Sequence, residues 1–229
     1  MSVFDRFFDQ YDRLVFFDTE TTGLRFPIDE IIEFSAVVLE KQNGKCVVTR
    51  EYDELITLAP GNTVPPFIQT LTGITDQDIQ ERGVPKKQVC RDMAELFAGK
   101  ALLLAYNAHF DFSFLYYMLL RDGDPTILRG KDKIDLLTVY KDRHSYPHKL
   151  CSAIDVYGLG DKVQNSHRAI DDVLATVAVM EAMLQEKDDI HRYTNLFGYN
   201  SKYGLEGKPI GSITYKSQDY DPPKPLYEL

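Results

Sequence analysis

Residues 13–23 read Arg-Leu-Val-Phe-Phe-Asp-Thr-Glu-Thr-Thr-Gly, and this stretch decides the fold. The unbroken apolar run that ends at Asp18 is typical of a strand buried on both faces of a sheet. Side chains two positions apart on a strand point to the same face, so Asp18 and Glu20 leave the strand end together. In open α/β sheets, ligands bind beyond such strand ends. By itself, however, an acidic pair beside a turn is more often a solvated loop.

The elements that follow predict a mixed sheet. Residues 30–41 form a second strand, Asn43-Gly44 is a strong hairpin signal, and a third strand spans 45–58. Further strands are expected at 101–106 and 133–136. Helices are expected after Pro65, Thr75 and Pro85, and over 109–121, 149–157 and 169–187. An opening meander followed by alternating strands and helices predicts an α/β fold with a mixed five-stranded sheet flanked by helices.

Two further polar motifs follow predicted sheet elements. Asn107-Ala-His-Phe-Asp111 comes directly after the strand at 101–106 and puts a carboxylate at the start of a helix. His167-Arg-Ala-Ile-Asp171-Asp172 opens the last long helix, with His167 in the preceding loop. Each motif alone also fits a plain structural role, such as a carboxylate that stabilises a helix N-terminus. Helix spacing does not distinguish Asp171 from Asp172.

Together and in this order, the motifs resemble a known family. Asp18-x-Glu20-Thr-Thr-Gly-Leu, Asn107-x-x-Phe-Asp111 and His167-x-Ala-x-x-Asp172 are similar to the three motifs of the DEDDh family of 3′→5′ exonucleases. Within that family, the likeness is to the proofreading exonuclease of bacterial DNA polymerase III, of the epsilon type. It covers residues 13–185 and implies a ribonuclease H-like fold.

The resemblance also implies roles for individual residues. Two divalent cations, Mg²⁺ or Mn²⁺, would be bound by Asp18, Glu20, Asp111 and Asp172, and His167 would be the general base. Asp172 is preferred over Asp171 because the last acid of the family stands five residues after the histidine. Residues implied to contact or support the terminal nucleotide are Thr21, Thr22, Gly23, Leu24, Asn107 and Phe110. Paired cations suit phosphodiester hydrolysis because they stabilise both the attacking and the departing oxygen.

The expected activity is therefore removal of nucleoside 5′-monophosphates from the single-stranded 3′ end of DNA, in proofreading or repair. A DNA polymerase is the expected partner. Two alternatives remain open at this stage: an exoribonuclease that trims RNA, and a nucleic-acid-binding module that has lost activity.

Composition limits the remaining classes of function. The formal charge of −9 argues against a protein that grips long duplex DNA by neutralising phosphates. No apolar run reaches the ~20 residues of a membrane-spanning helix, so a cytoplasmic location without membrane contact is expected. The cysteines Cys46, Cys90 and Cys151 are expected to be buried or half-buried free thiols.

The composition of the sequence changes near residue 189. We expect an exonuclease domain at 1–189 and a C-terminal extension at 190–229, which holds six of the fourteen tyrosines. The extension either packs its tyrosines on the domain or offers a surface for a polymerase or for stacked bases. Residues 210–215 alternate weakly and suggest a strand. The basic cluster at 141–149 is a candidate for contact with the strand backbone.

Overall fold

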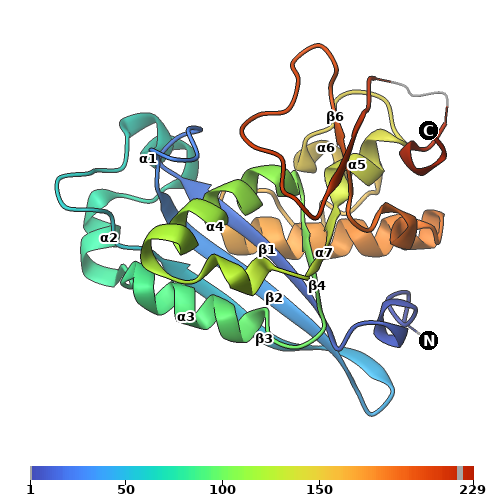
Figure 1. Ribbon diagram of the computed structural model, residues 1–229, viewed down its shortest axis with the longest axis horizontal. Coiled ribbons are helices and arrows are strands. Elements are labelled where there is room, and N and C mark those ends of the chain that lie inside the picture. Colours follow the sequence, from blue (N-terminus) through green and yellow to red (C-terminus); the bar gives the residue numbers. More distant parts are fainter. Residues whose placement is uncertain (1, 221–223) are drawn as a thin grey trace.

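The computed structural model describes residues 2–220 and 224–229, and its centre is a five-stranded mixed sheet (Figure 1). The strand order is β3-β2-β1-β4-β5. The strands are β1 (Arg13–Thr21), β2 (Ile31–Gln42), β3 (Lys45–Leu55), β4 (Ala101–Ala105) and β5 (Asp132–Asp135). The first three strands pair antiparallel, whereas β1, β4 and β5 run parallel. The α/β fold class and the opening meander predicted from the sequence are confirmed.

Helices cover both faces of this sheet. Val15 and Phe17 of β1 pack with α3 (Lys86–Leu96) and α4 (Ala108–Asp122) in one apolar core. Leu14 and Phe16, which alternate with them, pack with α7 (Ala169–Glu186) in a second core on the opposite face. Figure 1 shows α3 and α4 in front of the sheet and α7 behind it. The period-two alternation of β1 therefore sets which side chains face which helix layer.

The remaining helices are short. Helix α1 (Pro66–Thr72) ends at Gly73, and α2 (Asp76–Arg82) begins with a capping box in which Thr75 and Asp78 bond reciprocally, as the sequence indicated for Thr75. Helices α5 (Leu136–Lys141) and α6 (Leu150–Val156) follow β5. Helix α5 was not predicted, and the third strand ends at Leu55 rather than at residue 58.

The C-terminal extension is built into the cores. It carries β6 (Leu196–Tyr199) and β7 (Thr214–Ser217), which pair parallel in a separate two-stranded sheet. Asn195 joins this sheet to β5, because its N–H donates to the Lys133 carbonyl while its side-chain oxygen accepts from the Lys133 N–H. Tyr193, Phe197 and Leu226 are no more than 1% exposed. The expected strand at 210–215 is wrong in its bounds, because regular pairing begins only at Thr214.

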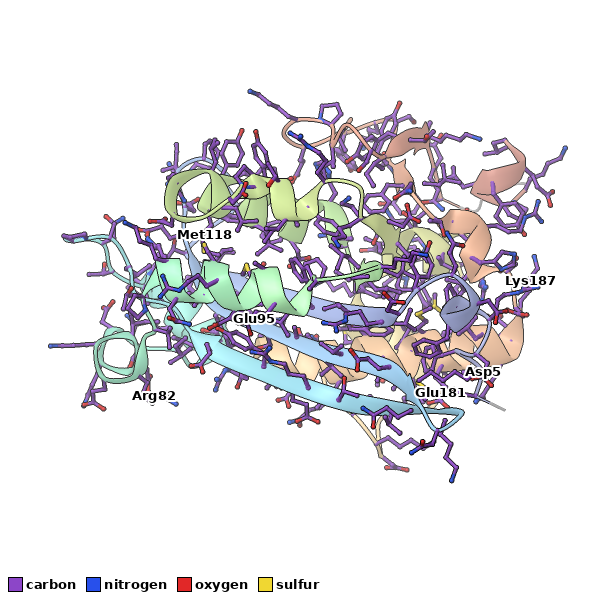
Figure 2. The ribbon with its side chains drawn as sticks, turned by 60° about the horizontal axis from the view of Figure 1, so that its bottom comes forward. Asp5, Arg82, Glu95, Met118, Glu181 and Lys187 are labelled. Carbon is purple, nitrogen blue, oxygen red and sulfur yellow. The ribbon has the colours of Figure 1, made fainter. Side chains whose placement is uncertain are left out.

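The N-terminal segment lies at the C-terminal end of α7. Arg6 bonds to the carboxylate of Asp188, 2.9 Å away, and Figure 2 shows Asp5 and Glu181 at this same end of the molecule. No helix among the described residues has the length and apolarity that a membrane crossing requires. All three cysteines are unpaired, and Cys151 is exposed rather than half-buried.

Candidate active site

The carboxyl end of β1 brings two of the sequence-predicted acids to the sheet edge. Asp18 and Glu20 lie on the face of β1 that α7 covers, since they alternate with Thr19 and Phe17. Thr19 points to the other face and holds Asp111 of α4. Its N–H and hydroxyl donate to the same Asp111 oxygen, at 3.0 and 2.7 Å. Thr19 therefore ties the second motif to the first.

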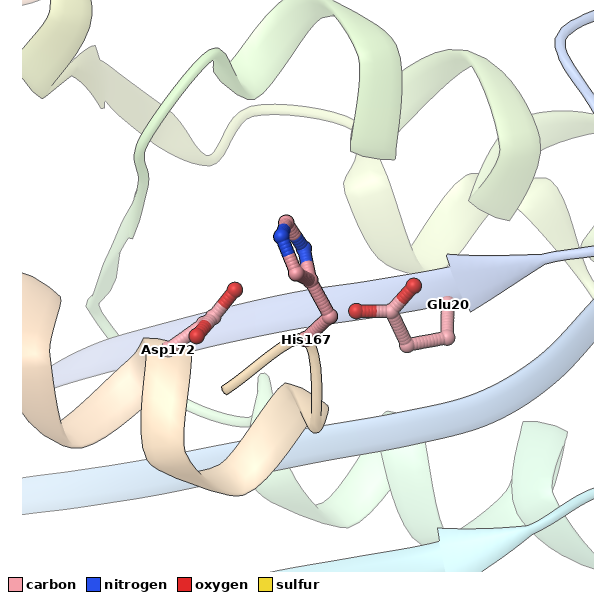
Figure 3. A group of neighbouring side chains, drawn as sticks. All are labelled: Glu20, His167 and Asp172. Carbon is pink, nitrogen blue, oxygen red and sulfur yellow. The ribbon is translucent and has the colours of Figure 1, made fainter. Parts of the chain in front are cut away.

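The third motif meets the first across the edge of the sheet. One ligand atom each of Glu20, His167 and Asp172 lies within 4.8 Å of the other two. Figure 3 shows the Glu20 and Asp172 carboxylates flanking the His167 side chain, with Glu20 from β1 and Asp172 from the first turn of α7. His167 has φ of +56°, a strained conformation for a non-glycine residue that is typical of functional sites.

His167 is exposed, and its ring nitrogens make no hydrogen bond within residues 2–220 and 224–229. An imidazole in this state is free to bond to a water molecule or a substrate. Asp172, by contrast, is 7% exposed and accepts a 2.5 Å hydrogen bond from the Asn165 amide through Oδ2.

Burial raises the pKa of all four carboxyl groups. The pKa of Glu20 rises to about 8 because of burial and the charges of Asp172 and Glu33. Burial raises the pKa of Asp111 to about 7 despite its bonds to Thr19, and that of Asp172 to about 6 despite its bond to Asn165. The pKa of Asp18 is raised well above its usual range by burial and then by its acidic neighbours. The raised pKa values show that the folded chain disfavours ionisation of these four groups together, a cost that bound cations would offset.

The residues present fit divalent cations. Oδ1 of Asp172 is fully buried and has no hydrogen-bond partner within the described residues. A buried acceptor without a donor is costly, and a cation would satisfy it. The other proposed metal ligands, Asp18, Glu20 and Asp111, also offer carboxylate oxygens, which suit hard ions such as Mg²⁺ and Mn²⁺.

A buried ion pair that the sequence analysis missed fixes the start of α7. Glu33 of β2 lies opposite Glu20 in the sheet and is fully buried. Its Oε1 accepts from Nε and Nη2 of Arg168 at 2.9 and 2.5 Å, and its Oε2 accepts from the Ala169 N–H at 2.8 Å. An acidic residue inside an otherwise apolar strand was the available signal, because buried carboxylates need partners. The bonds of Glu33 therefore position Arg168, the residue that directly follows His167.

A second missed residue, Asp135, holds the turn that leads into α4. Asn107 has φ of +69°, and the N–H groups of Asn107 and Ala108 donate to Oδ1 of Asp135 at 2.9 and 3.1 Å. The same carboxylate also accepts from the Leu137 N–H and the Thr138 hydroxyl, and so caps α5. Asp135 therefore fixes the entry of the helix that presents Asp111.

The loop that follows β1 is fixed by hydrogen bonds within the chain. Thr22 exchanges two hydrogen bonds with Glu30, through its N–H to the Glu30 carbonyl and through its hydroxyl from the Glu30 N–H. A Cβ on Gly23 would lie 2.5 Å from an Asp29 carboxylate oxygen, so a larger residue there would require the Asp29 side chain to shift. Leu24 is 73% exposed. Thr21, however, is buried and donates its hydroxyl to the Gly23 carbonyl, so it shapes the loop from within.

The other residues that the sequence predicted to contact substrate differ in exposure and in their bonds to the rest of the chain. Asn107 is exposed, and Phe110 is half-buried against Phe26 and Phe114. In the basic cluster, Arg143 is bound by Asp189 and Glu186, His144 by Tyr157, and His148 is buried. Asp171 accepts from Ser166 and Gln164 instead of joining the cluster of Figure 3.

Comparison with known proteins identifies the family of this chain. The family model described as "Exonuclease" (RNase_T) matches residues 15–180. The chain belongs to the exonuclease family. The match includes all five residues that the sequence analysis singled out as metal ligands or base.

Relatives of this exonuclease chain are considerably longer. The PolC-type DNA polymerase III of Clostridium perfringens is 30% identical over 225 residues, which cover 95% of this chain and 15% of that protein. The 3′-5′ exonuclease DinG of Bacillus subtilis is 33% identical over 166 residues, 64% of this chain and 17% of that protein. The exonuclease chain thus spans no more than 17% of the length of these two relatives.

Solved structures show the same fold. Escherichia coli Exonuclease I, crystallised with a dA16 oligonucleotide, superposes with a TM-score of 0.68 and 22% identity, over 80% of this chain and 42% of that one. The ribonuclease H-like fold class that the resemblance implied is therefore confirmed.

Proposed function

We propose that this exonuclease chain hydrolyses the 3′-terminal phosphodiester of single-stranded DNA and releases nucleoside 5′-monophosphates. The observation that carries the proposal is the meeting of Glu20, His167 and Asp172 within 4.8 Å. At the same strand end Thr19 bonds to Asp111, whose charge acts on Asp18. We infer the 3′→5′ direction of hydrolysis from the name of the DinG relative. We infer DNA as the substrate from the DNA polymerase III relative and from the oligonucleotide complex of Exonuclease I.

In the proposed reaction, the carboxylates of Asp18, Glu20, Asp111 and Asp172 would hold two divalent cations. Bound cations would supply stabilisation of the charge that develops on the attacking and leaving oxygens. His167 accepts the proton of the attacking water at a ring nitrogen, since its exposed ring makes no hydrogen bond within the described residues.

The remaining parts of the site orient the strand. The loop at Thr22, Gly23 and Leu24 contacts the terminal nucleotide, and the exposed Leu24 side chain is available for this contact. Asn107 and Phe110 also support the terminal nucleotide in this proposal. Thr21 supports this loop from within through its bond to the Gly23 carbonyl.

The biological setting is part of the same proposal. Residues 1–189 form the exonuclease domain, and residues 190–229 form an extension of it. A DNA polymerase is the proposed partner, because the C. perfringens relative is a PolC-type DNA polymerase III. The cytoplasmic location expected from the sequence stays a prediction.

The test is digestion of a 5′-labelled single-stranded DNA oligonucleotide with Mg²⁺ or Mn²⁺. We expect products that shorten by one nucleotide at a time and retain the label, and we expect EDTA to stop the reaction. Immediate release of the label as a mononucleotide, internal cuts, or full activity in EDTA would contradict the proposal. An RNA oligonucleotide of the same sequence, if cut faster, would assign the site to RNA.

Two neighbouring acids provide a matched pair of variants. Asp172→Asn removes a proposed ligand and is expected to abolish activity and the rise in melting temperature that Mn²⁺ produces. Asp171→Asn changes the same charge one residue away, where the carboxylate bonds to Ser166 and Gln164, and is expected to keep most activity. Equal activity of the two variants would remove Asp172 from the site.

A further inference from the structure

The loop between β6 and β7 is fixed over the first turn of α4, next to the proposed site. His109 bonds to the Tyr215 hydroxyl through Nδ1 at 2.8 Å and to the Glu206 carbonyl through Nε2 at 2.5 Å. Because a carbonyl can only accept, Nε2 carries the proton, and Nδ1 accepts from the hydroxyl. His109 stands two residues before Asp111, so the extension is attached directly to the second motif (Figure 1).

Beside this attachment lies an open cavity of about 260 Å³. One side comes from the motif and its surroundings, through Asn107, Phe110 and Phe26. The other side comes from the extension, including Tyr199 and Tyr203. The volume is just below the ~300–1,000 Å³ that is typical of ligand pockets, which suits one planar base rather than a longer segment. The cavity therefore continues the surface proposed to contact the terminal nucleotide into a part of the chain that lies beyond the matched residues 15–180.

One lysine and two acids line the cavity, and a second lysine lies beside its Tyr203 ring. Lys141 lines it and makes no ion pair within the described ranges 2–220 and 224–229. Lys202 lies 5.2 Å from the centre of the Tyr203 ring, and Tyr203 is 70% exposed. Of the acids in the lining, Asp135 already accepts from the chain at both oxygens. Glu206 lines the cavity as well and anchors His109 through its backbone carbonyl.

We propose that this cavity is a subsite for a nucleotide upstream of the 3′ terminus, with its base on Tyr203 and its phosphate near Lys141. The inference rests on the proposed function, in which Asn107 and Phe110, two residues of the cavity lining, support the terminal nucleotide. An exposed tyrosine stacks on any base, so the subsite adds affinity for single strands without selecting sequence. The extension thus acts as part of the substrate site as well as of the core.

The test compares two substrates in the full chain. One is a twelve-nucleotide single-stranded DNA, and the other is the p-nitrophenyl ester of thymidine 5′-monophosphate, which has no upstream nucleotide. Tyr203→Ala and Lys141→Gln are each expected to lower kcat/KM for the oligonucleotide about fivefold or more, chiefly through KM, and to leave ester hydrolysis unchanged. The matched controls Tyr116→Ala, exposed farther along α4, and Lys87→Gln, on α3, are expected to change neither substrate.

Two results would overturn the subsite: an oligonucleotide kcat/KM that matches the controls, or equal losses on both substrates. If the parent chain cleaves neither substrate, the proposed function fails, and the subsite is decided separately by fluorescence anisotropy of a labelled dT12 with Mg²⁺. Weaker binding by Tyr203→Ala than by Tyr116→Ala then supports the subsite. Equal binding, or no binding by the parent, rejects it.

Discussion

Replacing Arg168 with alanine removes the partner of a fully buried carboxylate. Glu33 accepts three hydrogen bonds, two from the Arg168 guanidinium and one from the Ala169 N–H. Arg168→Ala leaves the Glu33 charge buried next to Glu20 and Asp18, whose raised pKa values already reflect its repulsion. The variant therefore carries an uncompensated charge in the most acidic part of the fold.

The size of the effect follows from the burial of the pair. Breaking a buried ion pair by removing one partner costs ~3–5 kcal/mol. The Arg168 side chain is 36% exposed, so solvent screens part of this interaction. We expect a loss of about 2–3 kcal/mol in the free energy of unfolding. Hydrolysis should also slow, because the residue after His167 is no longer held.

The assay is equilibrium urea unfolding in EDTA, so that bound cations do not contribute. Arg82→Ala is the matched control, since Arg82 pairs with Asp78 on the surface at 2.6 Å and such pairs contribute ~0–1 kcal/mol. A double variant, Glu33→Gln with Arg168→Ala, removes the stranded charge and should be more stable than the sum of the single losses predicts. The reasoning is refuted if Arg168→Ala costs no more than Arg82→Ala.

Two further predictions concern protons. The pKa values of Glu20 (about 8), Asp111 (about 7) and Asp172 (about 6) lie above those of the unfolded chain, so these groups stabilise the metal-free fold at low pH and that stability is lost between about pH 4 and pH 8. For Asp172 alone, a pKa difference of about two corresponds to ~2.7 kcal/mol. Melting temperature measured in EDTA should therefore fall as pH rises, and Mg²⁺ should raise it more at pH 8 than at pH 5; a flat pH profile would contradict this. His167→Ala should slow hydrolysis ~10²–10⁴-fold while Mn²⁺ still raises the melting temperature, and near-normal turnover would remove His167 as the base.

Much of the fold followed from local patterns. The apolar run before Asp18 and the Asn43-Gly44 turn determine the antiparallel meander, and both signals span only a few residues. Helix α5 was missed because it follows β5 without any loop, and its cap is the Asp135 carboxylate at the strand end. The parallel pairing of β6 with β7 joins strands separated by a long loop, which periodicity alone does not reveal.

The candidate site likewise has parts that the sequence indicated and parts that only the tertiary structure reveals. The resemblance carried by the three motifs pointed to the carboxylates and to His167, and it preferred Asp172 where helix spacing left Asp171 open. The contacts that hold them in place link distant residues: Glu33 to Arg168, 135 positions apart, and Thr19 to Asp111, 92 positions apart. His109 shows the same limit, since its partners Tyr215 and Glu206 lie in the extension. Such pairs become visible only when the tertiary fold is known.

The most direct measurement of the central claim is anomalous diffraction from crystals soaked with Mn²⁺ and a nucleoside 5′-monophosphate. We predict two peaks ~3.5–4 Å apart among the carboxylates of Asp18, Glu20, Asp111 and Asp172, with the phosphate between them and His167 beside it. Peaks elsewhere, or no peak next to the buried Asp172 oxygen that lacks a partner, would contradict the proposed active site.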